Sequence, residues 1–83
     1  MKILYFAHFR EKTNIAEETI DLPNDVTNVE TLIDWLVERN DSFADAFVDR
    51  EHVRVAVNQE HVEFDMPVKV DDEIAFFPPM TGG

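Results

Sequence analysis

The sequence predicts a single α+β domain in which one main helix packs on one face of a mixed β-sheet. Stretches with strand periodicity lie on both sides of one strongly amphipathic stretch, an order that favours this architecture. The chain has 83 residues, enough for one hydrophobic core but not for two. Its hydrophobic fraction of 45% and charged fraction of 30% exclude wholesale disorder.

Two strands are expected before the helix. Residues 3–9 are rich in aromatic and branched side chains, which suit a pleated strand. Residues 17–22 predict a weaker strand, in which Ile20 and Leu22 alternate with polar residues. The segment Pro23-Asn24-Asp25 then ends the pattern.

The main helix is expected to begin near Thr27, because Thr27 and Glu30 have the spacing of a capping box. Apolar residues then recur at helical spacing and form one stripe: Val29, Leu32, Ile33, Leu36 and Val37. Arg39 is expected in the last turn, where a cation complements the helix dipole. Residues 42–48 predict a short second helix.

The remaining elements are expected to be strands. Residues 53–57 place valine at every second position, which predicts a half-buried strand. A turn at 58–61 leads into a short strand at 62–64. Residues 73–77 predict the final strand, which Pro78-Pro79 ends because proline cannot donate to a ladder.

Parity along the strands divides their side chains between the two faces of the sheet. The face under the helix is predicted to form the core: Ile3, Tyr5, Ile20, Leu22, Val53, Val55, Val57, Ile74 and Phe76. The opposite face takes Leu4, Phe6, His8, Arg54, Ala56, Ala75 and Phe77. Phe6 and Phe77 on an uncovered face would indicate a partner site. A register error of one residue would instead bury both.

The composition excludes several classes of function. Seven basic and 18 acidic residues give a net charge of −11, which phosphate backbones and anionic lipids repel. The acidity favours a protein partner with a basic docking face, or it serves solubility alone. The chain contains no cysteine, which excludes disulfides and thiolate sites and fits the cytoplasm. The three histidines have no ligand spacing, so we expect no metal site.

The only two glycines, Gly82 and Gly83, are the last two residues, whereas average usage predicts roughly six. Met80-Thr81-Gly82-Gly83 is therefore expected to project as a flexible Gly-Gly tail. A peptide this thin can enter a narrow channel and present its carboxylate to a partner. A partner that uses ATP could convert this carboxylate to an acyl-adenylate, which sulfide, a thiol or an amine would capture. The alternative is a frayed terminus with accidental glycines.

Three segments resemble the MoaD family, the small subunit of molybdopterin synthase among the ubiquitin-like β-grasp sulfur carriers. They are residues 4–11 (LYFAHFRE), 55–59 (VAVNQ) and 72–83 (DEIAFFPPMTGG). The resemblance spans the chain and implies one β-grasp domain over residues 1–83, of which 79–83 form the projecting tail. The C-terminal segment is its most specific part.

The resemblance implies a mechanism of sulfur transfer. An E1-like (MoeB-like) enzyme would use ATP to adenylate the carboxylate of Gly83, and sulfur would replace the activated oxygen to give a thiocarboxylate. Met80, Thr81 and Gly82 would carry it into the active site of the large (MoaE-like) subunit, where cyclic pyranopterin monophosphate receives the sulfur. Two donations build the dithiolene of molybdopterin. The chain itself would bind no cofactor and would not catalyse alone.

The resemblance also implies which residues contact the large subunit: Phe6, Arg10, His61 and Phe77. It implies a cytoplasmic heterotetramer in which two small subunits flank a large-subunit dimer. Family members tend to have a glycine in the turn before the last strand, whereas residues 69–72 contain none.

Three other functions compete with this interpretation. A thiamine-thiazole sulfur carrier shares the fold and the Gly-Gly end, but such carriers are usually shorter and lack the segment 42–50. A ubiquitin-like modifier would join Gly83 to lysines of target proteins. A plain interaction module would not need Gly83 at all.

Overall fold

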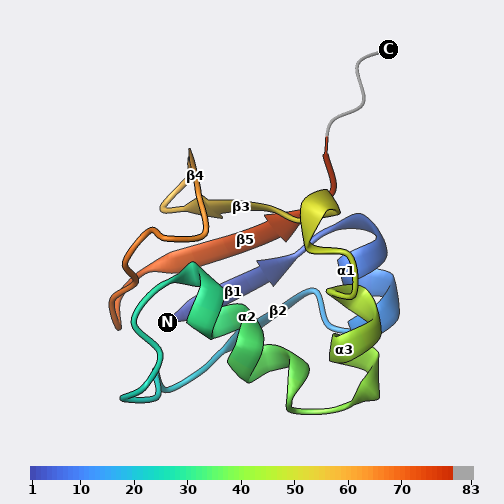
Figure 1. Cartoon of the computed structure of the whole chain (residues 1–83), viewed down its shortest axis with the longest axis horizontal. Coiled ribbons are helices and arrows are strands. Elements are labelled where there is room, and N and C mark those ends of the chain that lie inside the picture. Colours follow the sequence, from blue (N-terminus) through green and yellow to red (C-terminus); the bar gives the residue numbers. More distant parts are fainter. Residues whose placement is uncertain (80–83) are drawn as a thin grey trace.

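A computed structural model of the chain describes residues 1–79, and its elements form a mixed sheet with helices (Figure 1). In chain order these are β1 (Lys2–Tyr5), α1 (Ala7–Thr13), β2 (Glu17–Thr19), α2 (Val29–Val37), α3 (Asp41–Ala46), the 3₁₀ turn η1 (Arg50–His52), β3 (Arg54–Val57), β4 (Glu60–Val62) and β5 (Glu73–Phe77). The predicted α+β class is confirmed. None of the helices in residues 1–79 combines the length and the apolarity needed to cross a membrane.

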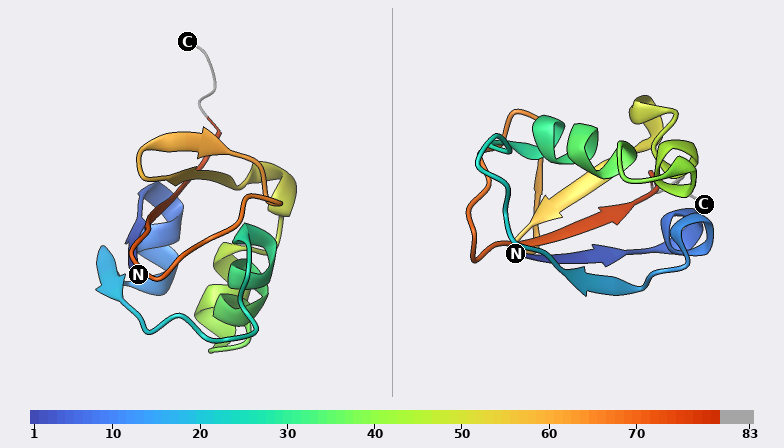
Figure 2. Two further views of the ribbon diagram at one scale, coloured as in Figure 1. Left: turned by 90° about the vertical axis from the view of Figure 1, so that its left-hand side faces the viewer. Right: turned by 90° about the horizontal axis from the view of Figure 1, so that it is seen from below.

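The five strands lie in the order β2-β1-β5-β3-β4. The first and last strands are parallel neighbours at the centre of the sheet, with Ile3 opposite Ile74 and Tyr5 opposite Phe76. The other pairs are antiparallel. Figure 2 shows α2 and α3 on one side of the strands. The strand that leads to the C-terminus is therefore held on both edges, by β1 and by β3.

The hydrophobic core lies between the sheet and α2, as predicted. The strands contribute residues that are at most 4% exposed: Ile3, Tyr5, Val55, Val57, Ile74 and Phe76. Val53, which was predicted within the strand, lies one residue before β3 and is 3% exposed. The predicted stripe of α2 supplies Val29, Leu32, Ile33 and Leu36, all fully buried, while Val37 is half-buried. Ile20 and Leu22 are also only half-buried, because β2 ends at Thr19 and they follow it in irregular chain.

The predicted strand over residues 3–9 is wrong after Tyr5. Ala7 adopts a left-handed backbone conformation (φ 51°), and helix α1 begins there. Phe9, which the predicted core did not include, is fully buried, and it reaches the core from the helix, where its ring centroid lies 5.0 Å from that of Phe47. A buried residue at position 9 is compatible with both a strand and a helix, so the apolar pattern of residues 3–9 could not distinguish the two. His8 consequently does not lie on the strand face to which it was assigned.

The predicted start of the main helix is wrong by one residue. The N-cap is Asn28, whose Oδ1 accepts from the Thr31 N–H at 2.9 Å, while the Thr31 hydroxyl accepts from the Asn28 N–H at 3.0 Å. This reciprocal pair satisfies free amide donors of the first turn. The helix ends at Val37, so Arg39 lies beyond the last turn and does not complement the helix dipole there.

The later elements agree closely with the sequence analysis. Helix α3 begins one residue before the predicted position, after the cap Asn40. Strand β4 lies at 60–62 rather than 62–64, because the turn before it needs only Asn58 and Gln59, both with positive φ. Strand β5 has the predicted bounds.

Residues 1–79 contain no glycine, and other residues form their turns. Positive φ in residues 1–79 occurs at Ala7, Asn14, Asn58 and Gln59, so other residues take the positions that glycine usually serves. The turn at 69–72 needs no positive φ. It is closed by the Asp72 N–H, which donates to the Lys69 carbonyl, and by the Asp72 carboxylate, which accepts from the Lys69 N–H at 2.7 Å and from the Asn58 amide at 2.9 Å.

Candidate docking surface and the base of the C-terminal segment

The sheet face opposite α2 carries the candidate site. Strand register places Leu4, Ala75, Ala56 and His61 in one row across four strands, and it pairs Arg54 with Phe77 in the next row. Directly paired residues point to the same face of a sheet. We call the surface made by these residues the open face: Leu4, Arg54, Ala56, His61, Ala75 and Phe77.

The open face is apolar at its centre. Ala56 is buried, Leu4, Ala75 and Phe77 are half-buried, and His61 is exposed. The ring centroids of His61 and Phe77 lie 5.1 Å apart, so the histidine covers one side of the phenylalanine. Since Ile74 and Phe76 are fully buried while Phe77 is not, the alternative of a register error is wrong.

Phe6 lies at the end of the open face. Its N–H donates to the Phe76 carbonyl at 3.1 Å and so extends the β1–β5 ladder by one residue. Its side chain is 45% exposed, the chain's most exposed aromatic of those with a described placement. Arg10 is exposed on α1, one turn after Phe6. The strand register thus places Phe6, His61 and Phe77 on one surface, whereas Arg10 lies outside the sheet, on α1.

The predicted tail follows directly from β5. Phe77 is the last strand residue, Pro78 and Pro79 are half-buried, and the description of the chain ends there. The predicted tail residues Met80, Thr81, Gly82 and Gly83 lie outside the described residues. The base of the tail is therefore a central strand, which fixes its starting point beside the open face.

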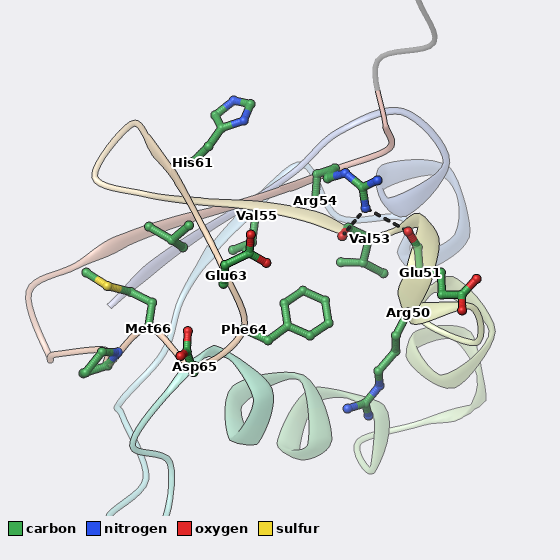
Figure 3. A pocket seen from close by; sticks show the side chains of 12 residues that line it. Arg50, Glu51, Val53, Arg54, Val55, His61, Glu63, Phe64, Asp65 and Met66 are labelled. Atoms are coloured by element: carbon green, nitrogen blue, oxygen red, sulfur yellow. Dashed lines mark hydrogen bonds between the residues drawn. The ribbon is translucent and has the colours of Figure 1, made fainter.

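Sequence reasoning assigned Arg54 to this face but gave it no role. Its Nη1 donates to the carbonyls of Glu51 at 2.8 Å and Val53 at 3.2 Å (Figure 3). Both acceptors belong to the end of η1, which precedes β3. The contact depends on the fold of η1, so the sequence carried no signal for it beyond parity.

A second cluster, on the helix side, was also missed. Arg39 donates to both carboxylate oxygens of Glu18, at 2.8 and 3.0 Å, and the Tyr5 hydroxyl donates to Oε2 at 2.7 Å. Burial raises the pKa of Glu18, but the hydrogen bonds from Arg39 and Tyr5 outweigh burial and hold this pKa below its ordinary value. Burial, followed by the Glu18 carboxylate, raises the pKa of Tyr5. The cluster ties β1 and β2 to the chain after α2.

A groove of about 940 Å³ is lined by η1, β3, β4 and the segment 63–67 that follows β4 (Figure 3). The Phe64 ring points into it and His61 stands at its rim. Arg50 on its wall is neutralised by Glu30 at 3.1 Å and Asp34 at 2.7 Å. Within residues 1–79 no three His, Asp or Glu side chains are grouped so that they could hold a metal.

Comparisons with known proteins agree with this arrangement. The sequence profile of the ThiS family matches residues 3–83. The chain is 39% identical over 83 residues to the "Molybdopterin synthase sulfur carrier subunit" of Escherichia coli, covering all of this chain and 99% of that protein. It is 34% identical over 86 residues to the human protein of the same name, covering all of this chain and 93% of the human one.

Solved structures give the same result for the fold. The "Putative molybdopterin converting factor, subunit 1" of Pyrococcus furiosus superposes with a TM-score of 0.74 at 32% identity, covering 95% of each chain. SAMP1 of Haloferax volcanii superposes with a TM-score of 0.73 at 27% identity, covering all of this chain and 98% of that one. The ubiquitin-like β-grasp fold is confirmed.

Proposed function

This chain belongs to the ThiS family, and we propose that it is the sulfur carrier subunit of a molybdopterin synthase. The observation that carries the proposal is its 39% identity, over the whole chain, to a relative of that name. The fold supports it, because the central strand β5 ends at Phe77, beside an apolar surface, and only Pro78-Pro79 separate that strand from the last four residues of the sequence.

The proposed chemistry takes place at the Gly83 carboxylate. An E1-like enzyme joins this carboxylate to the AMP part of ATP and releases pyrophosphate. A sulfur nucleophile then displaces AMP, which leaves a thiocarboxylate. After its sulfur has passed to cyclic pyranopterin monophosphate, an oxygen from water restores the carboxylate. Because ATP supplies the activation, we place this cycle in the cytoplasm.

The open face is the proposed contact with the large subunit. Phe6, His61 and Phe77 supply apolar and aromatic area, and aromatic residues are enriched in the central parts of interfaces. With the body docked there, Met80, Thr81 and Gly82 extend from the end of β5 into the large subunit's active site. Two copies of the chain on a large-subunit dimer would complete the heterotetramer.

The test is the mass of the chain purified from its own cells. We expect a fraction in which one oxygen of Gly83 is replaced by sulfur, and we expect that fraction to disappear when Gly83 is removed. Mixed with the purified large subunit and cyclic pyranopterin monophosphate, the thiocarboxylated chain should yield the dithiolene. A thiocarboxylate that forms but gives no dithiolene would point instead to another sulfur acceptor, such as the thiazole precursor of thiamine.

A protein-modifier function is the second candidate, favoured by the structural likeness to SAMP1, a small archaeal modifier protein. It predicts isopeptide bonds between Gly83 and lysines of other proteins. Mass spectrometry of the same cells separates the two, because digestion would leave Gly83-derived remnants on target lysines. Such remnants without a thiocarboxylate would overturn the carrier proposal.

A further inference from the structure

Arg54 is held differently from Arg39 and Arg50, the two arginines that form salt bridges within residues 1–79. Arg39 binds Glu18, and Arg50 binds Glu30 and Asp34. The Arg54 guanidinium is instead held by two backbone carbonyls and forms no salt bridge within residues 1–79. What distinguishes Arg54 is that backbone contacts hold its guanidinium in one position while no carboxylate of the described residues neutralises it.

The free part of this guanidinium is suited to a carboxylate. Only Nη1 donates to described acceptors, so the donors on Nε and Nη2 form no hydrogen bond within residues 1–79. An arginine fork binds a carboxylate through two parallel hydrogen bonds. Because the carbonyls of Glu51 and Val53 already hold the side chain, little rotamer entropy remains to be lost on binding.

Arg54 also lies at a defined place on the open face. It is paired across the β3–β5 ladder with Phe77, the last strand residue before the C-terminal segment. At the other end of this face Lys2 is neutralised, because it binds Glu17 at 3.4 Å and is paired with Glu73. The positive charge of the open face is therefore concentrated where β5 ends.

Acidic residues lie on both sides of the sheet, and Glu51, Glu63 and Asp65 line the same groove as Arg54. Exposed or half-buried acidic residues follow the helices on the other side of the sheet: Glu30, Asp34, Glu38, Asp41 and Asp45. Arg54 is thus a single cation near the base of the tail within an acidic surface, and a partner's carboxylate that approaches Phe77 can pair with it.

We propose that Arg54 is a specificity-determining contact whose guanidinium binds an aspartate or glutamate of the large subunit beside Phe77. The inference rests on the proposed function, since it takes the large subunit as the partner of the open face. The resulting ion pair would orient the docked body and so direct the C-terminal segment towards the active site.

The test is the affinity of the full-length chain for the purified large subunit, measured by titration calorimetry at low and moderate salt. Arg54→Gln should raise Kd about 10-fold at low salt and should flatten its dependence on salt. Arg54→Lys keeps the charge but loses the forked guanidinium, so its Kd should lie between those of the wild type and Arg54→Gln. Lys69→Gln is the matched control: it also removes one positive charge, but from the turn before β5, and should leave Kd within about 2-fold.

The outcomes separate this inference from the proposed function. Equal affinities of the wild-type chain and Arg54→Gln would overturn the contact while leaving the carrier function standing. A wild-type chain that carries no thiocarboxylate and does not bind the large subunit would overturn both. Thermal unfolding checks that Arg54→Gln is folded. If it is not, the Kd values of Arg54→Lys and Lys69→Gln are compared instead. Equal Kd values for these two variants and the wild type would contradict the contact.

Discussion

The two sides of β5 serve different purposes although their residues alternate along one strand. Ile74 and Phe76 are fully buried, and the Phe76 ring packs edge-on against Phe47 at 4.9 Å. Ala75 and Phe77 point to the open face and are half-buried. One side therefore stabilises the fold, while the other leaves apolar area for a partner. The same strand can thus anchor the fold through one side and offer a docking surface on the other.

Removing the tail gives the sharpest separation of the two roles. Deletion of Gly82-Gly83 should abolish sulfur transfer, because no carboxylate remains in reach of the activating enzyme. Folding should be unaffected, because the hydrophobic core of the described residues is built from side chains between Met1 and Phe76. Transfer is measured as dithiolene formed with the large subunit, and stability as the midpoint of thermal unfolding. A large fall in that midpoint would show that the tail belongs to the body.

Substituting Phe76 and Phe77 in turn tests directly whether the two sides of β5 serve different purposes. Phe76→Ala removes a fully buried ring and should cost about 3–5 kcal/mol of unfolding free energy. Phe77→Ala should cost less than about 1.5 kcal/mol, since its ring is only partly buried. It should, however, weaken binding to the large subunit by at least about 10-fold. Urea unfolding and titration calorimetry measure the two effects, and unchanged affinity in Phe77→Ala would refute the open face as the docking surface.

The Tyr5–Glu18–Arg39 cluster gives a smaller, pH-dependent effect on the helix side. Glu18→Gln should lower the free energy of unfolding by about 1–2 kcal/mol at neutral pH, because it weakens charge-assisted hydrogen bonds. The pKa of Glu18 lies below its ordinary value of 4.5 in the folded state. Its contribution is therefore complete above pH 4.5 and is lost as the pH falls through the lowered pKa.

The unfolding free energy of Glu18→Gln should accordingly approach that of the wild type at acidic pH. Glu17→Gln is the matched control: its exposed pair with Lys2, at 3.4 Å, should change stability by less than about 0.5 kcal/mol. Binding to the large subunit should not change in Glu18→Gln at neutral pH, because Glu18 lies with Tyr5 on the helix side. A loss of affinity in Glu18→Gln would mean that the helix side also contacts the partner.

Much of the open face could be predicted, because strand parity is a local property. The assignment of Ala75 and Phe77 to one face and of Ile74 and Phe76 to the other required only the order of residues in β5. Phe6 was assigned correctly to an exposed surface for the wrong reason, since it precedes a helix instead of lying within a long strand. The chain forms α1 where a strand was predicted because Ala7 adopts a left-handed conformation, which the alternation of residues did not reveal.

The amino-acid order by itself determined the fold class, the alternation of buried and open residues along the strands, and the placing of the only two glycines at the chain end. These follow from local periodicity and composition, to which each residue contributes independently of distant ones. Only the tertiary structure decided that β1 and β5 are adjacent, that Arg54 is held by the end of η1, and that Arg39 binds Glu18 and does not cap its own helix. Such contacts join residues that are distant in sequence or placed by a turn, and their energies exist only once the chain has folded.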